Sequence, residues 1–173
     1  AVAGVKDVVV NTFYLGSMIE EHVKRRQDLD ITISREDELL DTGGGVLNKI
    51  DFFGDTPFYV LNADVLWTDG PVPALKRMSD MWDSATMDLL LLLHPAKDVP
   101  AYAGAGDYYM AEGSHQPVFA KRAGFQHPAN YIFAGPRIVH PRLFQSEARK
   151  AFSFLDLFHR AEQVQRLYGL RHD

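Results

Sequence analysis

An acidic residue at the end of an apolar run is the first candidate for chemistry. Residues 58–61 are apolar or aromatic, which predicts a central strand that is buried on both faces of a parallel sheet. Asn62 and Asp64 follow this strand. Ligands of open α/β sheets bind beyond the carboxyl ends of the strands, and Mg²⁺ takes one or two carboxylates together with substrate phosphates. Asp64 is therefore a candidate metal ligand, and the alternative is that it only caps the next turn.

A run of glycines is the second candidate. Thr42, Gly43, Gly44 and Gly45 lie between a short apolar segment and the helical pattern of residues 46–53. Glycines at a loop-to-helix junction let backbone N–H groups approach a ligand closely. No Gly-Lys-Ser/Thr follows, so the run is not a P-loop, and a plain turn is the alternative. We expect this loop and the Asp64 strand end to lie at the same edge of the sheet.

Residues 104–107 form the third candidate, a glycine-containing loop that ends in Asp107. Such a loop is able to bind sugar hydroxyls, and the alternative is a hairpin entry with a solvated acid.

The histidines show no metal-ligand spacing and no serine lies in a nucleophile elbow. Asp80, Asp83 and Asp88 fall around a predicted helix end and strand start, and we interpret them as a solvated rim.

Composition restricts the class of protein. The 173 residues fit one domain with a hydrophobic core. The absence of cysteine excludes disulfides, thiolate metal sites and a cysteine nucleophile, and it gives no support for secretion. The net charge of −5 argues against broad nucleic-acid binding, but a divalent cation is able to bridge acidic residues to a phosphorylated substrate. We expect a cytoplasmic protein with no nucleic-acid or membrane partner.

Strands that alternate with helices must position these candidates. In the first half of the chain, strands are predicted at residues 5–10, 31–34, 58–64 and 87–93, and helices at residues 15–26, 46–53 and 71–81. In the second half, short strands are predicted at residues 108–110, 118–120, 131–134 and 138–139, a helix at 154–164 and a strand from residue 166. This order predicts a three-layer α/β fold with a mostly parallel mixed sheet.

The two ends indicate an incomplete domain. Residues 1–4 have the pattern of a last helical turn with its glycine cap, and residues 166–173 have that of an interrupted strand. We expect residues 1–173 to be a single domain that is truncated at both ends.

Read together, these stretches resemble one family, the sugar-1-phosphate nucleotidylyltransferases of the bacterial mannose-1-phosphate guanylyltransferase type. Within it they are most similar to the N-acetylmuramate-1-phosphate uridylyltransferases of peptidoglycan recycling. The resemblance is collinear over nearly the whole chain, and its stretches are VVNTFYL (9–15), LDTGGG (40–45), VLNADVLW (60–67), GAGDY (104–108), YIFAG (131–135), HPRLF (140–144) and RLYGL (166–170).

The resemblance implies a Rossmann-like nucleotidyltransferase fold and an NDP-sugar product. A sugar 1-phosphate would attack the α-phosphorus of UTP or GTP, with Mg²⁺ on the phosphates and pyrophosphate as the leaving group. The site residues that it implies are Asp64 for the metal; Thr42, Gly43, Gly44 and Asn62 for the nucleotide; and Gly106, Asp107, Tyr131 and Gly135 for the sugar.

The chain also departs from the family pattern. It lacks the family's first glycine-rich loop, which carries an Arg and a Pro-Lys pair, and the Trp-x-x-Val-Gly-Thr segment with a second metal-binding position. Ala63 stands where Gly or Ser is usual. We therefore expect these 173 residues alone to be weak or inactive. The alternatives are a guanylyl enzyme, a nucleotide-sugar-dependent glycosyltransferase, for which residues 62–64 supply only one acid, and a non-catalytic nucleotide-binding subunit.

Overall fold

The computed structural model describes residues 4–120, 128–148 and 150–173. The chain forms two compact units, which are described separately. The first contains Ala1–Gly54 and Phe144–Leu157, and the second contains Asp55–Leu143 and Phe158–Asp173. Most of the helical turn predicted for residues 1–4 lies outside the described residues. The expectation of a single domain stays a prediction.

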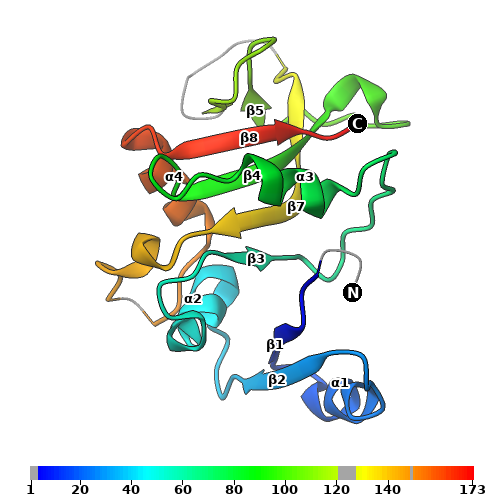
Figure 1. The fold of residues 1–173 in the computed structure, drawn as a ribbon, viewed down its shortest axis with the longest axis vertical. Helices are drawn as coiled ribbons and strands as arrows, with labels where there is room; N and C mark the ends of the chain where they lie inside the picture. Colours follow the sequence, from blue (N-terminus) through cyan, green and yellow to red (C-terminus); the bar gives the residue numbers. More distant parts are fainter. Residues whose placement is uncertain (1–3, 121–127, 149) are drawn as a thin grey trace. The chain divides into compact units, whose positions relative to one another are not determined.

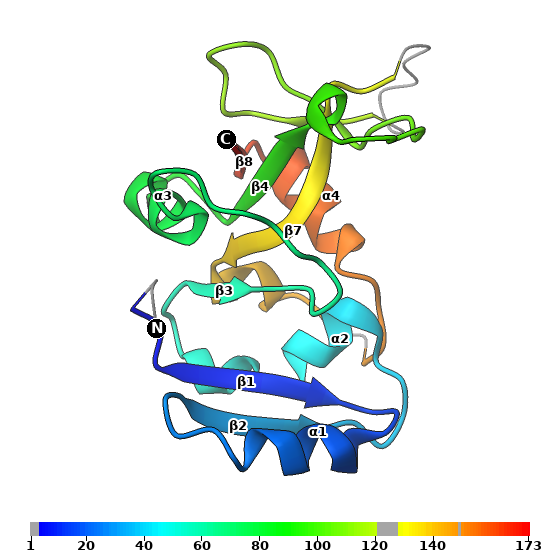
Figure 2. The ribbon, with the colours of Figure 1, turned by 90° about the vertical axis from the view of Figure 1, so that its right-hand side faces the viewer.

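The first unit holds a parallel pair of strands. β1 (Asp7–Thr12) pairs with β2 (Asp30–Arg35), in register from Asp7 opposite Asp30 to Thr12 opposite Arg35. α1 (Gly16–Val23) connects them, and Figure 2 shows it beside β2. α2 (Asp41–Leu47) and a short 3₁₀ turn, η1 (Ile50–Phe53), follow. The carboxyl ends of β1 and β2 therefore lie at one edge, immediately before the segment that leads into α2.

The second unit holds the larger sheet, which is mixed (Figure 1). Its strand order is β6-β5-β7-β4-β8, and β3 also pairs with β7. The strands are β3 (Phe58–Val60), β4 (Leu89–Pro95), β5 (Tyr108–Tyr109), β6 (Val118–Phe119), β7 (Tyr131–Val139) and β8 (Leu167–Arg171). The remaining elements are α3 (Ala74–Met81), α4 (Leu155–Gln163), η2 (Ala96–Asp98) and η3 (Pro141–Phe144).

The predicted α/β class is confirmed, and the sheet is mixed as expected. The expected predominance of parallel pairs needs correction for the described strands, because only β1–β2 and β4–β8 are parallel. β7 runs antiparallel to β3, β4 and β5, and β5 runs antiparallel to β6. The two predicted strands at residues 131–134 and 138–139 are one strand, β7, that continues through Gly135 and Pro136.

The second unit is layered around β4. Its five consecutive leucines, residues 89–93, are fully buried, as expected for a strand that is covered on both faces. Leu90 and Leu92 pack with Met78 of α3 and Ile138 of β7 in one hydrophobic cluster. Figure 2 shows α3 and α4 on opposite sides of β4 and β7. This arrangement gives the helix–sheet–helix layers that the alternating pattern predicted.

Strand β3 is shorter and less buried than predicted. Phe58 is buried, but Tyr59 and Val60 are half-buried and Leu61 is 47% exposed. In the described structure β3 pairs only with β7, and its last pair joins Val60 and Arg137. The next partner in this antiparallel register is Pro136, which has no backbone N–H to donate. The prediction of a central strand buried on both faces is therefore wrong.

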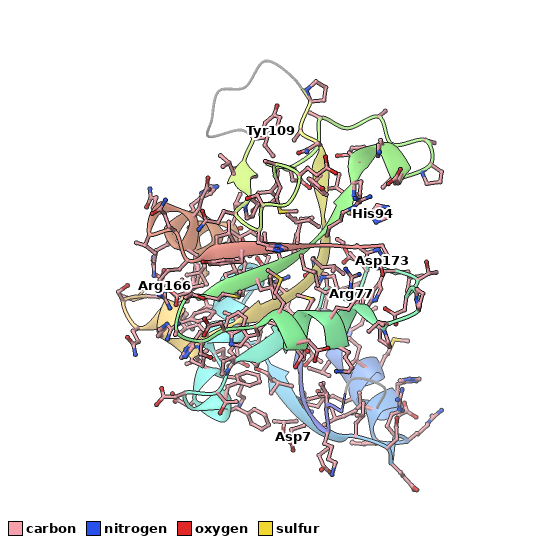
Figure 3. All side chains as sticks on the ribbon, turned by 45° about the horizontal axis from the view of Figure 1, so that its top comes forward. Asp7, Arg77, His94, Tyr109, Arg166 and Asp173 are labelled. Carbon is pink, nitrogen blue, oxygen red and sulfur yellow. The ribbon has the colours of Figure 1, made fainter. Side chains whose placement is uncertain are left out.

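A buried acid joins the start of β4 to the start of β8. Asp88 is only 8% exposed, so its interpretation as part of a solvated rim is wrong. Its Oδ1 accepts one hydrogen bond from Nε of Arg142 and another, of 2.8 Å, from Nε of Arg166. Figure 3 labels Arg166 at the beginning of β8. The two guanidinium groups also donate to the backbone carbonyls of residues 84, 85 and 87, so one carboxylate organises this end of the sheet.

Two histidines lie at the other end of β4 and β8. Nδ1 of His94 and Nδ1 of His172 are 3.2 Å apart, and His172 is only 5% exposed. Beyond them Arg77 pairs with Asp173 at 2.6 Å, and Figure 3 shows His94, Arg77 and Asp173 near this end of the sheet. Burial, followed by the charge of His94, lowers the pKa of His172 below its usual value of 6.5.

We expect the second unit to lose stability in mild acid. Because the pKa of His172 is lower in the folded chain, the unfolded chain binds the proton more readily below the usual pKa of 6.5. The free energy of unfolding is therefore highest above that pH and falls as the pH drops below it. Urea unfolding between pH 7.5 and 5.5 measures this slope, and His172→Gln should flatten it. Burial also lowers the pKa of His140, and this second histidine accounts for the slope that remains.

Candidate functional site

Asp64 lies in a turn after β3, and its side chain is exposed. Within the described residues no side chain or backbone group donates a hydrogen bond to its carboxylate. Asp69 instead bonds the start of α3, because its Oδ1 accepts from the N–H of Ala74 at 2.8 Å and from Nε1 of Trp67 at 3.2 Å. The structure therefore gives Asp64 no capping bond and leaves its carboxylate open to a ligand.

The arrangement around Asp64 fits Mg²⁺ better than a metal that needs an all-protein site. No group of three or more His, Asp or Glu side chains able to hold a metal occurs in the part of the chain that the structure describes. Mg²⁺ keeps several waters and is commonly bound by one or two carboxylates together with substrate phosphates. A single exposed carboxylate after a strand meets that requirement, whereas structural Zn²⁺ requires four protein ligands.

Asn62 is held by strand β7. Its Oδ1 accepts a hydrogen bond of 2.9 Å from Nη1 of Arg137, and the same nitrogen donates to the carbonyl of Gly135 at 3.0 Å. Gly135 has a φ of +97° and its Cα faces Val65, so a Cβ there would lie 3.2 Å from that side chain. Among the predicted site residues, Asn62 and Gly135 are thus brought together through Arg137, which the sequence analysis did not select.

The predicted sugar loop packs against the first half of β7. The N–H of Asp107 donates to the carbonyl of Tyr131 at 2.8 Å, and its Oδ2 accepts from the N–H of Phe133 at 2.9 Å. Asp107 directly precedes β5, which pairs with β6, so the hairpin entry of the alternative is right, but the acid is half-buried and not solvated. Gly106 has a φ of +72°, and a Cβ there would lie 2.5 Å from the carbonyl oxygen of Ala129. The structure brings Gly106, Asp107 and Tyr131 together at one edge.

The glycine run belongs to the first unit, and its predicted conformation is wrong. Gly43, Gly44 and Gly45 lie inside α2 and are buried, not in a loop before a helix. The N–H groups of Gly43 and Gly44 both donate to the carbonyl of Phe152, at 2.9 and 3.2 Å. Oγ1 of Thr42 accepts from the N–H of Phe154 at 2.9 Å. Residues 150–154 therefore pack directly on the first turn of α2.

Close packing explains why α2 contains glycines. A Cβ on Gly43 would lie 2.4 Å from the ring of Phe152, and one on Gly44 would lie 2.2 Å from the backbone carbonyl oxygen of Lys150. Glycine inside a helix costs about 0.5–1 kcal/mol relative to alanine. The contacts with residues 150–152 are available only to a helix that lacks these side chains, and they offset this cost.

We expect Gly44→Ala to destabilise the first unit by about 1–3 kcal/mol, the usual cost of overpacking. The added methyl meets a backbone oxygen, which cannot move aside as a flexible side chain would. The urea midpoint of the purified variant measures the effect. Val46→Ala, in the same helix and half-buried, is the control and should cost less. Equal midpoints for Gly44→Ala and the unsubstituted chain would contradict the packing explanation.

Two further polar residues attach α2 to the carboxyl ends of β1 and β2. Nδ2 of Asn11 donates to the carbonyl of Gly45 at 2.7 Å and to Oε1 of Glu36 at 3.1 Å. Oε2 of Glu36 accepts from the N–H of Leu40 at 3.2 Å. Neither Asn11 nor Glu36 was among the candidate site residues predicted from the sequence. The available signal was their position, since Asn11 lies at the end of β1 and Glu36 directly follows β2.

No helix in the described part of the chain is long and apolar enough to cross a membrane. No protein-family model matches the chain.

A curated relative matches almost the whole chain. This is the N-acetylmuramate alpha-1-phosphate uridylyltransferase of Caulobacter vibrioides, which is 29% identical over 174 aligned residues. The alignment covers 97% of this chain and 70% of the relative.

Solved structures match the fold. The UTP-bound UDP-glucose pyrophosphorylase of Acinetobacter baumannii has a TM-score of 0.76 at 18% identity, over 99% of this chain and 71% of that one. HddC from Yersinia pseudotuberculosis in complex with GMP-PN has a TM-score of 0.67 at 18% identity, over 98% and 71%. These likenesses show the fold, and together with the curated relative they confirm the predicted resemblance.

Proposed function

We propose that this chain, a homologue of the sugar-1-phosphate nucleotidylyltransferases, transfers a uridylyl group from UTP to N-acetylmuramate 1-phosphate and releases pyrophosphate. The observation that carries this proposal is the 29% identity over 97% of the chain to a relative named for that reaction. The open carboxylate of Asp64 supports it. We also propose that both compact units belong to one nucleotidyltransferase domain, which works in the cytoplasm in peptidoglycan recycling.

The reaction needs positioning more than covalent participation of the protein. An oxygen of the sugar phosphate forms a bond to the α-phosphorus of UTP, and the bond from that phosphorus to the bridging oxygen of pyrophosphate breaks. The attacking phosphate is already ionised, so no protein base is needed. When bound at Asp64, Mg²⁺ would offset phosphate charge, which contributes several kcal/mol to the transition state.

The chain's own residues divide into three groups in this proposal. Asp64 holds the metal, and the sugar loop that contains Gly106 and Asp107 binds the sugar 1-phosphate. The nucleotide contacts are Thr42, Gly43, Gly44 and Asn62, and the sugar contacts are Gly106, Asp107, Tyr131 and Gly135. Asp107 keeps its loop against β7 through Phe133 and Tyr131, which supports a preformed acceptor site.

A guanylyl transfer to mannose 1-phosphate is the second candidate. HddC in complex with GMP-PN shares the fold at a TM-score close to that of the UTP-bound enzyme, so the fold alone does not select the base. Uridylyl transfer is preferred because the curated relative that matches the chain in sequence carries that name.

Pyrophosphate release by the full-length gene product tests the proposal. UTP and GTP are each offered with N-acetylmuramate 1-phosphate and with mannose 1-phosphate, in the presence of Mg²⁺. We expect release only with UTP and the muramate sugar. Release only with GTP and mannose 1-phosphate would establish the second candidate, and no release in any of the four mixtures would contradict both.

A further inference from the structure

We propose that Arg137 is a positioning residue that holds residues 62–65, and with them Asp64, on strand β7. This inference rests on the proposed function for the role of Asp64, but the contacts that carry it belong to the second unit alone. Arg137 is 3% exposed, which is unusual for a guanidinium group. Burial lowers its pKa to about 10, so it stays charged at neutral pH.

The first contact fixes the segment before Asp64. Nη1 of Arg137 donates to Oδ1 of Asn62 at 2.9 Å, two residues before the acid. The same nitrogen donates to the carbonyl of Gly135 at 3.0 Å, which orients the guanidinium group from its own strand. A hydrogen bond from a charged donor contributes a factor of about 10 to 100 to an equilibrium. The hydrogen bond from Arg137 is therefore strong enough to favour one position of the Asn62 side chain.

Gly135, whose carbonyl accepts from Arg137, lies against the segment after Asp64. Gly135 has a φ of +97°, and Val65 lies so close that an added Cβ would be 3.2 Å from two of its carbons. β7 is irregular at this point, because its register with β4 shifts between Leu91 and Leu93. Asn62 and Val65 flank Asp64 on either side, so the irregular part of β7 holds the turn at both ends.

The guanidinium group is itself held in place by aromatic rings. The Cζ of Arg137 lies 5.7 Å from the ring centroid of Phe133 and 5.8 Å from that of Phe158. The two rings pack edge to face, with centroids 5.3 Å apart. Cation–π contacts of this kind are stronger for a desolvated cation. Two aromatic contacts and two hydrogen bonds leave the donor little freedom, which is what a positioning residue needs.

Arg137→Met tests the inference, because methionine fills much of the same space without donating a hydrogen bond. We expect the NMR order parameters of the backbone of residues 61–66 to fall towards the flexible range, below about 0.6. The Mg²⁺ concentration for half-maximal turnover of the full-length protein should rise about tenfold, the lower end of what the lost bond contributes. Arg137→Lys, which keeps a cationic donor, should recover most of both effects.

Ile138→Ala is the matched control. Ile138 is the next residue on β7, is 4% exposed and packs in the cluster with α3, so its truncation weakens the same strand without touching Asn62. We expect a loss of overall stability with no selective change at residues 61–66. The same order parameters at residues 61–66 and the same Mg²⁺ requirement in Arg137→Met and Ile138→Ala would overturn the positioning role. Absence of transferase activity in the unsubstituted protein would contradict the proposed function, and the order parameters would still decide the role of Arg137.

Discussion

Asp64→Asn is expected to lower the kcat of the full-length protein by about a thousandfold, because a metal ion on transferring phosphates contributes several kcal/mol and about 1.4 kcal/mol corresponds to a factor of ten. Asparagine keeps the size of the side chain but removes the charge that attracts Mg²⁺. The carboxylate has no hydrogen-bond partner in the described structure, so the substitution removes no contact that holds the fold. The urea midpoint should therefore be unchanged.

Asp69→Asn is the matched control for this prediction. Its Oδ1 accepts from the N–H of Ala74 at the start of α3, and the amide oxygen of asparagine is able to accept the same bond, so both stability and turnover should stay close to those of the unsubstituted protein. The measurement is initial pyrophosphate release at a series of Mg²⁺ concentrations. Near-normal turnover of Asp64→Asn at low Mg²⁺ would mean that the metal is held elsewhere, and it would remove Asp64 from the site.

The types of the elements followed from local pattern, but their ends did not. The apolar run at residues 89–93 predicts a buried strand, and these five leucines of β4 are fully buried. The run at residues 58–61 has the same local character, yet β3 ends at Val60 because its antiparallel partner at the next position is Pro136. That proline is far along the chain. A strand end that is set by a distant partner has no signal in the strand's own residues.

The conformation of the glycine run was also set by residues distant in the sequence. Three glycines in a row favour a loop by intrinsic propensity, since glycine is a poor helix former. In the structure they lie in α2, because residues 150–152 pack so closely that a side chain would not fit. Tertiary packing outweighs the local preference here. The glycines are selected by residue type alone, but their conformation depends on a segment about 100 positions away.

Buried charges were the least predictable features. Asp88 and its two arginines are separated by 54 and 78 positions in the sequence, and nothing in the local pattern distinguishes Asp88 from the exposed Asp83. Arg137 occurs in a strand-like segment where an outward-facing charge is the ordinary interpretation. The burial of Asp88 and of Arg137 is evident only once the strands are paired, because burial is a property of the assembled sheet.

Replacement of Asp88 should have the largest effect on stability. Removal of one partner of a buried ion pair leaves uncompensated charge and typically costs about 3–5 kcal/mol. Here two guanidinium groups share one carboxylate, and their side chains are 31% and 29% exposed, compared with 11% for the acid. Partial exposure lets water screen the arginines, so we expect Asp88→Asn to cost about 3 kcal/mol, at the lower end of that range. This is a large share of the 5–15 kcal/mol that usually stabilises a domain.

The Asp88 prediction separates a charge effect from a packing effect. Asp83→Asn is the control, since Asp83 is exposed and its carboxylate accepts from the N–H of Ala85 and the hydroxyl of Thr86 in its own turn. Urea midpoints of both variants measure the difference. The triple variant Asp88→Leu, Arg142→Met and Arg166→Met removes all three charges at once, and it should recover part of the lost stability because apolar replacements of buried ion pairs are often tolerated. If Asp88→Asn unfolds at the same urea concentration as Asp83→Asn, the carboxylate does not organise the ends of β4 and β8.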